Sequence, residues 1–241
     1  MQHYQVIILA GGMGTRLSPV TKTIPKVLVP ISDRPFVFWQ LDLLIDNGIN
    51  EIVMCVGYKG EEVERVVGSL YRGAPIKYSY ERQDELLGTG GALKNAEHLL
   101  NTSFGVIYGD SYLEIDYVSV FEAHKSSSFP VTMTVWKNQN CLENSNVLLS
   151  EDGMSVTRYE KTGNSNGFQY IDYGFSVFDK EIISSYSGAG VHMELSTLQY
   201  DLSKENRLGA FEVNQRFYEI GSKSGLKEFE TYLLDHNINK E

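Results

Sequence analysis

Two hydrophobic patterns alternate through the first half of the chain. Short apolar runs rich in β-branched residues are typical of strands buried on both faces, and they occupy residues 6–10, 51–58 and 104–110. Apolar residues that recur with a helical period predict helices over residues 36–48, 60–71 and 88–100, while residues 76–81 alternate as a strand does. Strands and helices in this order predict a mainly parallel sheet with helices on both sides.

The second half of the chain has more strand-like stretches and fewer helical ones. Its strand patterns cover residues 129–137, 146–150, 156–161, 170–178 and 208–213. We expect antiparallel strands here that extend the sheet edge and form the second wall of a cleft, in an α/β fold with a Rossmann-like, mainly parallel but mixed sheet. Without a linker or repeat, residues 1–241 are expected to form one domain, with lobes of about 1–128 and 129–223 and an amphipathic C-terminal helix at 224–236.

Composition and charge narrow the class of protein. The chain has 241 residues, of which 42% are hydrophobic, so it can bury a sizeable core without disulfides or metal staples. Its formal net charge of −10 argues against non-specific binding to nucleic acid or to an anionic membrane. We find no signal peptide and no apolar run of membrane-spanning length, and therefore expect a cytoplasmic protein. Of the two cysteines, Cys55 lies in an apolar run and is expected in the core, whereas Cys141 falls in a polar loop.

A glycine-rich loop follows the first strand, in the stretch ILAGGMGTRLSPVTKTIPK. Its glycines allow backbone amides to approach a ligand, and Arg16 and Lys26 add two positive charges, so a polyphosphate is the expected ligand. Gly57 and Asp110 follow two other parallel strands, whose carboxyl ends are expected to meet this loop. The loop does not fit a P-loop, and it fits the dinucleotide fingerprint only in part, because Leu17 stands where the third glycine should be.

Residues 9–31, LAGGMGTRLSPVTKTIPKVLVPI, closely resemble the signature of the sugar-1-phosphate nucleotidylyltransferases. The resemblance implies a glycosyltransferase-A-like nucleotidyltransferase fold in which this loop wraps a nucleoside triphosphate. It also implies roles for individual residues. Arg16 would hold the departing pyrophosphate and Lys26 would lie near the phosphates at the reacting centre. The residues expected against the nucleotide are Leu9, Ala10, Gly11 and Gly12.

Later segments are similar to further elements of this family. In ERQDELLGTGGAL, the resemblance implies that Gln83 reads the base edge and that Gly88 lets the base lie against the backbone. Asp110 matches a family element that binds Mg²⁺, a cation that prefers oxygen ligands. Glu219 occupies the position of the second metal ligand, which is usually an aspartate, so its carboxylate is one methylene longer.

Two short motifs in the lobe at about 129–223 resemble the family elements that bind the sugar phosphate. In RYEKTG, Glu160 is expected to bind sugar hydroxyls and Lys161 the acceptor phosphate. In YIDYGFSVF, Asp172 and Gly174 fall on an element usually written N-x-G, so an acid stands where asparagine is usual. An ionised acid accepts hydrogen bonds but cannot donate them, which leaves acceptor specificity open. His192 is expected to be a loop or helix-cap residue.

The resemblance implies an enzyme that transfers a nucleoside monophosphate from an NTP to a sugar 1-phosphate, with Mg²⁺ as cofactor. The short build resembles the heptose-1-phosphate guanylyltransferases, which suggests synthesis of surface polysaccharide precursors, with a homodimer as one option for assembly. Base and acceptor stay open at this stage. The alternatives are a cytidylyltransferase acting on a non-sugar phosphate or phosphonate, a catalytically silent nucleotide-binding module, and a nicotinamide-dependent oxidoreductase that the failed fingerprint disfavours.

Overall fold

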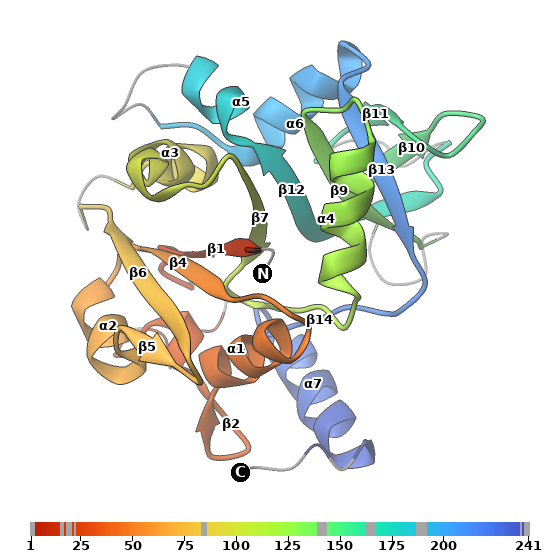
Figure 1. The fold of residues 1–241 in the computed structure, drawn as a ribbon. Helices are drawn as coiled ribbons and strands as arrows, with labels where there is room; N and C mark the ends of the chain where they lie inside the picture. The colour runs from red at the N-terminus through yellow and green to blue at the C-terminus, as the bar shows by residue number, and fades with distance from the viewer. Residues whose placement is uncertain are drawn as a thin grey trace.

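The apolar runs of the first half form the parallel part of one large sheet (Figure 1). The computed structural model describes residues 3–14, 17, 21, 23–82, 86–138, 144–161, 167–186, 192–236 and 238. Strand β1 pairs in parallel with β4 on one side and with β7 on the other, and β4 pairs in parallel with β6. These strands are β1 (Gln5–Ala10), β4 (Glu51–Val56), β6 (Ala74–Tyr80) and β7 (Ser103–Tyr108). The predicted parallel core is therefore confirmed.

Strands of the second half extend the sheet from β7. β12 (Tyr170–Asp179) pairs antiparallel with β7, and β9 (Val131–Lys137) pairs antiparallel with β12. β13 (Leu208–Val213) then pairs in parallel with β9. The short strands β10 (Val147–Leu149) and β11 (Val156–Tyr159) pair antiparallel beside β12. The predicted mixed pairing is thus confirmed. The strand order is β11-β10-β12-β7-β1-β4-β6-β5, where β5 is Leu70–Tyr71, and β9 branches from β12 and carries β13 on its other side.

Helices cover both faces of the sheet, because side chains alternate between the faces along each strand. Val6 and Ile8 of β1 pack in a core with α1 (Phe36–Asp46), α2 (Gly60–Val67) and α4 (Tyr117–Ser126). Ile7, between them, packs in the opposite core with α3 (Gly88–Asn95), α5 (Lys180–Ser185) and α6 (Leu195–Lys204). The sheet is therefore sandwiched between two helical layers, as the sequence patterns predict. Cys55, 1% exposed, lies in the second core, as expected.

The predicted helix at 60–71 is too long. α2 ends at Val67, because Gly68 adopts a left-handed backbone with φ of 78°. The chain then forms β5 (Leu70–Tyr71), which pairs antiparallel with β6, and Leu70 is 64% exposed rather than buried on a helix face. Similarly, the predicted helix at 88–100 divides into α3 and the short 3-10 helix η4 (Glu97–Leu99).

The C-terminal segment returns to the end of β7. β14 (Tyr218–Glu219) pairs antiparallel with β8 (Ser111–Tyr112), which immediately follows β7. Helix α7 (Lys223–Asp235) is capped by Ser222, whose side chain accepts a hydrogen bond from the amide of Gly225. α7 then packs against α1, where the rings of Phe36 and Phe229 meet edge to face at 5.5 Å. This return is what carries Glu219 to the strand ends.

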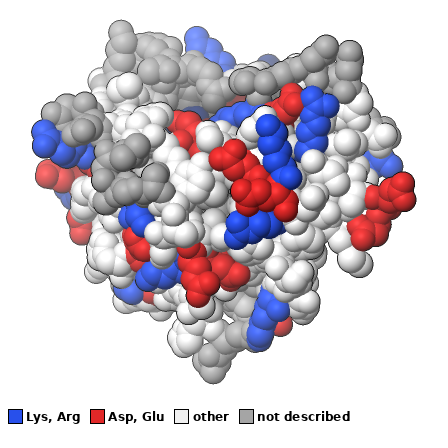
Figure 2. All heavy atoms as spheres, turned by 90° about the horizontal axis from the view of Figure 1, so that it is seen from above, with Lys and Arg blue, Asp and Glu red and all other residues white. Residues whose placement is uncertain are grey.

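The charged surface is mixed in sign. On the face seen in Figure 2, acidic and basic side chains lie side by side rather than in one basic field. Elsewhere in the described structure, opposite charges also pair, for example Arg72 with Asp42 and Asp46 at 3.0 and 2.8 Å. Within the described ranges, no helix combines the length and the apolar character that crossing a membrane requires.

Candidate active site

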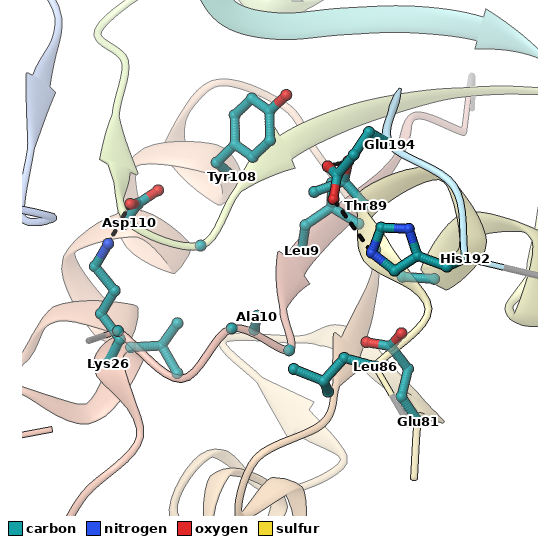
Figure 3. Close-up of a pocket in the computed structure, with 17 residues that line it drawn as sticks. Leu9, Ala10, Lys26, Glu81, Leu86, Thr89, Tyr108, Asp110, His192 and Glu194 are labelled. Carbon is teal, nitrogen blue, oxygen red and sulfur yellow. Dashed lines mark hydrogen bonds and ion pairs between the residues drawn. The ribbon is translucent and has the colours of Figure 1, made fainter. Parts of the chain in front are cut away.

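A cleft of about 420 Å³ lies beyond the carboxyl ends of β1 and β7, and Glu81, which follows β6, also lines it (Figure 3). The strand register explains why these ends coincide, since Leu9 lies opposite Cys55 of β4 and Tyr108 of β7. Beyond the sheet, the amide of Gly109 still donates to the Leu9 carbonyl at 2.9 Å. The glycine loop, the turn that holds Asp110 and the start of α3 therefore line the cleft together.

Two glycines of the cleft wall have no room for a side chain. A Cβ on Gly11 would collide with the carboxylate of Glu81. Gly88 adopts φ of 73°, and a Cβ there would lie 2.6 Å from the Met193 carbonyl. Leu9, Ala10, Gly11, Gly12 and Gly88 all line the cleft, as the sequence motifs lead us to expect. Glycine at these two positions thus lets Glu81 and the Met193 carbonyl approach the backbone of the cleft wall.

At one end of the cleft, Lys26 and Asp110 form an ion pair. Lys26 begins the short 3-10 helix η3 (Lys26–Leu28) directly after Pro25, and its stem packs against Gly14. The Lys26 ammonium donates a hydrogen bond to Asp110 Oδ2. The two side chains are only 14% and 25% exposed, so the pair is largely shielded from solvent.

Glu219 belongs to the same end. It lies opposite Ser111 in the β8–β14 ladder, and the amide of Ile220 donates to the Asp110 carbonyl at 2.9 Å. A Cβ on Gly221 would meet Glu219 Oε2 at 2.5 Å, Lys26 Nζ at 2.9 Å and Asp110 Oδ2 at 3.2 Å, so the three charged groups converge on one point. The structure thus brings together Lys26 and both acids that the sequence motifs single out.

The carboxylates of Asp110 and Glu219 suit a magnesium ion. Mg²⁺ in phosphate-handling sites is commonly held by one or two carboxylates, with substrate phosphates and water completing its shell. Among the described residues, no group of three or more acidic, histidine or cysteine side chains is placed to hold a metal ion. Glu219 is also oriented, because Ser222 Oγ donates to its Oε1 at 2.6 Å and the Gly221 amide donates to its Oε2.

The opposite end of the cleft holds polar residues that the sequence motifs did not single out (Figure 3). Thr89 Oγ1 donates to Glu194 Oε2 at 2.9 Å, and His192 Nε2 lies 3.7 Å from Glu194 Oε1. The segment is held against α3 because the amides of Gly90 and Gly91 both donate to the Met193 carbonyl. His192 thus lines the cleft. It is distant in the sequence from the residues before α3, and only the fold brings them to the same cavity.

Glu81 completes this second end. The Leu87 amide donates to Glu81 Oε1 at 2.9 Å, and Oε2 lies against Gly11. Burial raises the pKa of the Glu81 carboxyl, an effect only partly opposed by the Leu87 hydrogen bond and the nearby His192. The quoted motif ERQDELLGTGGAL contains this residue, but the motif alone draws attention to Gln83. The position of Glu81 could have indicated its role, because it is the last residue of a predicted strand, and the ends of such strands border the cleft.

The residues predicted to hold the sugar phosphate lie beside this cleft rather than in its wall. Glu160 and Lys161 line a separate hollow of about 370 Å³ with Ser196, Thr197 and Tyr200 of α6. Glu160 also accepts from Arg158 Nε at 2.8 Å.

Asp172 and Gly174 line neither of these two hollows as described. Asp172 accepts from the Gly174 amide at 3.0 Å and from the Tyr159 hydroxyl at 3.2 Å. Burial raises the pKa of the Asp172 carboxyl, while these hydrogen bonds and the charge of Lys161 oppose the shift. Gly174, at φ of 102°, has Tyr108 of the nucleotide-side cleft close by, with Cδ2 3.8 Å from where a Cβ would be.

Two predicted site residues, Arg16 and Gln83, lie outside the described residues, as does Cys141.

Comparison with known proteins gives a consistent result. The family model described as nucleotidyl transferase matches residues 5–235. The D-glycero-alpha-D-manno-heptose 1-phosphate guanylyltransferase of Aneurinibacillus thermoaerophilus is 34% identical over 188 residues, which are 75% of this chain and 79% of that protein. The protein of the same name from Campylobacter jejuni is 31% identical over 183 residues, covering 76% and 79%.

The structural comparison extends over nearly the whole chain. The crystal structure of HddC from Yersinia pseudotuberculosis complexed with GMP-PN superposes with a TM-score of 0.80 and 28% sequence identity. The match covers 95% of this chain and 99% of that one.

Proposed function

This chain belongs to the nucleotidyl transferase family, and from that premise we propose that it transfers a nucleoside monophosphate from an NTP to a sugar 1-phosphate. The products are an NDP-sugar and pyrophosphate. The observation that carries the proposal is the convergence of Lys26, Asp110 and Glu219 at one end of a cleft whose wall is bare glycine backbone. The heptose 1-phosphate guanylyltransferases among its relatives support a sugar 1-phosphate as the acceptor.

The proposed reaction needs no general base. A phosphate oxygen of the sugar 1-phosphate, already ionised at neutral pH, attacks the α-phosphorus of the NTP. The new O–P bond forms in line with the bond that breaks, and pyrophosphate leaves with that electron pair. Since both reactants are anions, their repulsion is the main obstacle, and catalysis consists of positioning and charge neutralisation.

The nucleotide-side residues supply the positive charge. Lys26 is proposed to contact the α-phosphate, because it is the cation among the described lining residues. The amides of Gly11 and Gly12 would approach the nucleotide, as the missing side chains allow. Arg16 is proposed to hold the leaving pyrophosphate on the strength of its motif alone.

Nucleotidyltransferases of this family commonly use a divalent metal. We propose that Asp110 and Glu219 hold Mg²⁺, which when bound neutralises phosphate charge. Lys26 pairs with the Asp110 carboxylate in the free protein, and it would pair with the phosphates of the substrate when the nucleotide binds. Ser222 and the Gly221 amide keep Glu219 in its orientation.

The acceptor side is proposed from the second lobe. Lys161 is assigned to the acceptor phosphate, and Glu160 to sugar hydroxyls. Asp172 and Gly174 would form the passage between their hollow and the nucleotide cleft, since Gly174 lies close to Tyr108 and its amide donates to Asp172. An acceptor reaching from one hollow to the other would meet these residues in turn. A cytoplasmic location, a homodimeric assembly and a role in surface polysaccharide precursor synthesis remain part of the proposal.

A substrate matrix tests the proposed function. Purified protein is incubated with Mg²⁺, each of ATP, GTP, CTP, UTP and dTTP, and a panel of sugar 1-phosphates, and pyrophosphate is measured. We expect release that requires both substrates. Release with no combination, or release without an acceptor, would contradict the transfer reaction. A Lys77→Ala variant, which removes an exposed cation far from the cleft, serves as the control for charge loss.

A further inference from the structure

The cleft has two chemically different ends. Lys26 and Asp110 lie at one end, and Glu81, His192 and Glu194 lie at the other (Figure 3). Between them the wall is largely apolar, with Leu9, Ala10 and Leu86 among its residues. The triphosphate and the base are opposite ends of a nucleotide. If the phosphates lie at the end that holds Lys26, the base edge therefore meets the end that holds Glu81 and Glu194.

Glu81 is the residue best placed to meet that edge. Its Oε2 lies so close to Gly11 that a Cβ there would collide with it, and its Oε1 accepts from the Leu87 amide at 2.9 Å. The side chain is thus fixed from two sides and borders the cavity. Each carboxylate oxygen has two lone pairs, so both oxygens can still accept from a ligand.

We propose that Glu81 selects guanine by accepting hydrogen bonds from its N1–H and its N2 amino group, with Glu194 adding to the acceptor character of this wall. This inference rests on one part of the proposed function, namely that a nucleotide binds in the cleft. It names the nucleotide as GTP, and it places the base-reading group at Glu81 rather than at Gln83 alone.

Base chemistry explains the selectivity. Guanine presents two neighbouring donors on its Watson–Crick edge, which match the two acceptor oxygens of a carboxylate. Uracil and thymine present one donor between two carbonyl oxygens, and cytosine and adenine present one amino group beside an acceptor nitrogen. Each of these would place a lone pair against a carboxylate oxygen and leave buried polar groups unpaired, which is costly. Partial burial raises the pKa of Glu81, and two N–H donors from a ligand would stabilise the carboxylate that burial disfavours.

The test is nucleotide binding without acceptor, measured by calorimetry, so it does not depend on turnover. We expect the wild-type protein to bind GTP about 10- to 100-fold more tightly than ITP, which lacks the N2 amino group, and more tightly than UTP. In Glu81→Gln, one acceptor becomes a donor, which suits the N3–H and O4 of uracil. The GTP-to-ITP ratio should fall toward one, and the ratio of GTP to UTP affinity should fall by about tenfold or more.

Controls separate this outcome from others. Glu61→Gln, an equivalent change on the exposed first turn of α2, should leave all three affinities unchanged. Equal wild-type affinities for GTP and ITP, or an unchanged ratio in a folded Glu81→Gln variant, would overturn the proposal. Tightest binding of UTP, dTTP or CTP would also overturn it, while pyrophosphate release with that nucleotide would leave the transfer reaction standing. If Glu81→Gln does not fold, the wild-type comparison of GTP with ITP still decides.

Discussion

The ammonium of Lys26 and the carboxylate of Asp110, 84 residues apart in the chain, form an ion pair at one end of the cleft. Each charge is therefore compensated in the free protein, and each is also the type of group that the proposed reaction requires. A nucleotide that enters the cleft offers Lys26 a phosphate in place of Asp110. The pair is thus the natural starting point for experiments.

Lys26→Ala should slow the reaction far more than it affects folding. The loss of a preorganised cation at the reacting phosphate is expected to lower kcat by about 100-fold or more. Asp110 loses its partner, but its side chain is 25% exposed and can be solvated, so the melting temperature should fall by only about 2–4 °C. Steady-state pyrophosphate release and thermal unfolding measure the two effects. Near-normal turnover would remove Lys26 from the mechanism.

Glu219→Ala should weaken binding of a divalent metal. Mn²⁺ titrated into nucleotide-free protein and followed by electron paramagnetic resonance is expected to bind about tenfold or more less tightly, since one of two carboxylate ligands is lost. Glu228→Ala is the matched control, because Glu228 lies nearby on α7 and pairs with Arg216 at the surface. Equal Mn²⁺ affinity in the two variants would argue that Glu219 does not bind the metal.

Gln40 should act as a positioning residue for Asp110. Its buried Nε2 donates to the carbonyls of Tyr108 and Ser111 at 2.9 and 2.6 Å, and so holds both sides of the turn that presents Asp110. Gln40→Leu leaves these carbonyls without that donor. We expect the free energy of unfolding to fall by about 1–3 kcal/mol, and Mn²⁺ affinity to fall as well.

Gln199→Leu provides the control for this change. Gln199 is also a buried glutamine whose Oε1 has no hydrogen-bond partner among the described residues, and its Nε2 bonds Ser176 at 3.3 Å, away from Asp110. This variant should lose stability but retain Mn²⁺ affinity. A similar loss of Mn²⁺ affinity in both variants would mean that Gln40 contributes only to packing.

Asp172→Asn should stabilise the protein increasingly as pH rises. Burial raises the pKa of Asp172 above its usual 3.8, so the folded state favours the neutral acid. Its favourable contribution is complete below the unfolded pKa and is lost as pH rises through the folded pKa. Urea unfolding measured from pH 4 to 7 should show that the free energy of unfolding of the variant increases relative to that of the wild-type protein as pH rises. A constant difference between them would indicate that Asp172 titrates alike in both states.

The strand patterns predicted much of the fold. The resemblance of the glycine loop to a family signature predicted the end of the cleft that holds Lys26 and Asp110. The β-branched runs identified the parallel strands, and each strand end predicted a neighbour of the cleft, including Gly11 and Asp110. The errors were local. The helical period of residues 60–71 continued past Gly68, where a left-handed backbone ends α2.

What the sequence determined by itself was local: which segments are buried strands, where glycine exposes the backbone, and which charges follow a strand end. Only the tertiary structure decided which distant groups meet. The β8–β14 ladder sets Glu219 beside Asp110, and the docking of residues 192–195 on α3 sets Glu194 across from Glu81. The physical reason is that periodicity and turn chemistry act over a few residues. Contacts across 80 to 110 residues depend on how whole strands pair and pack.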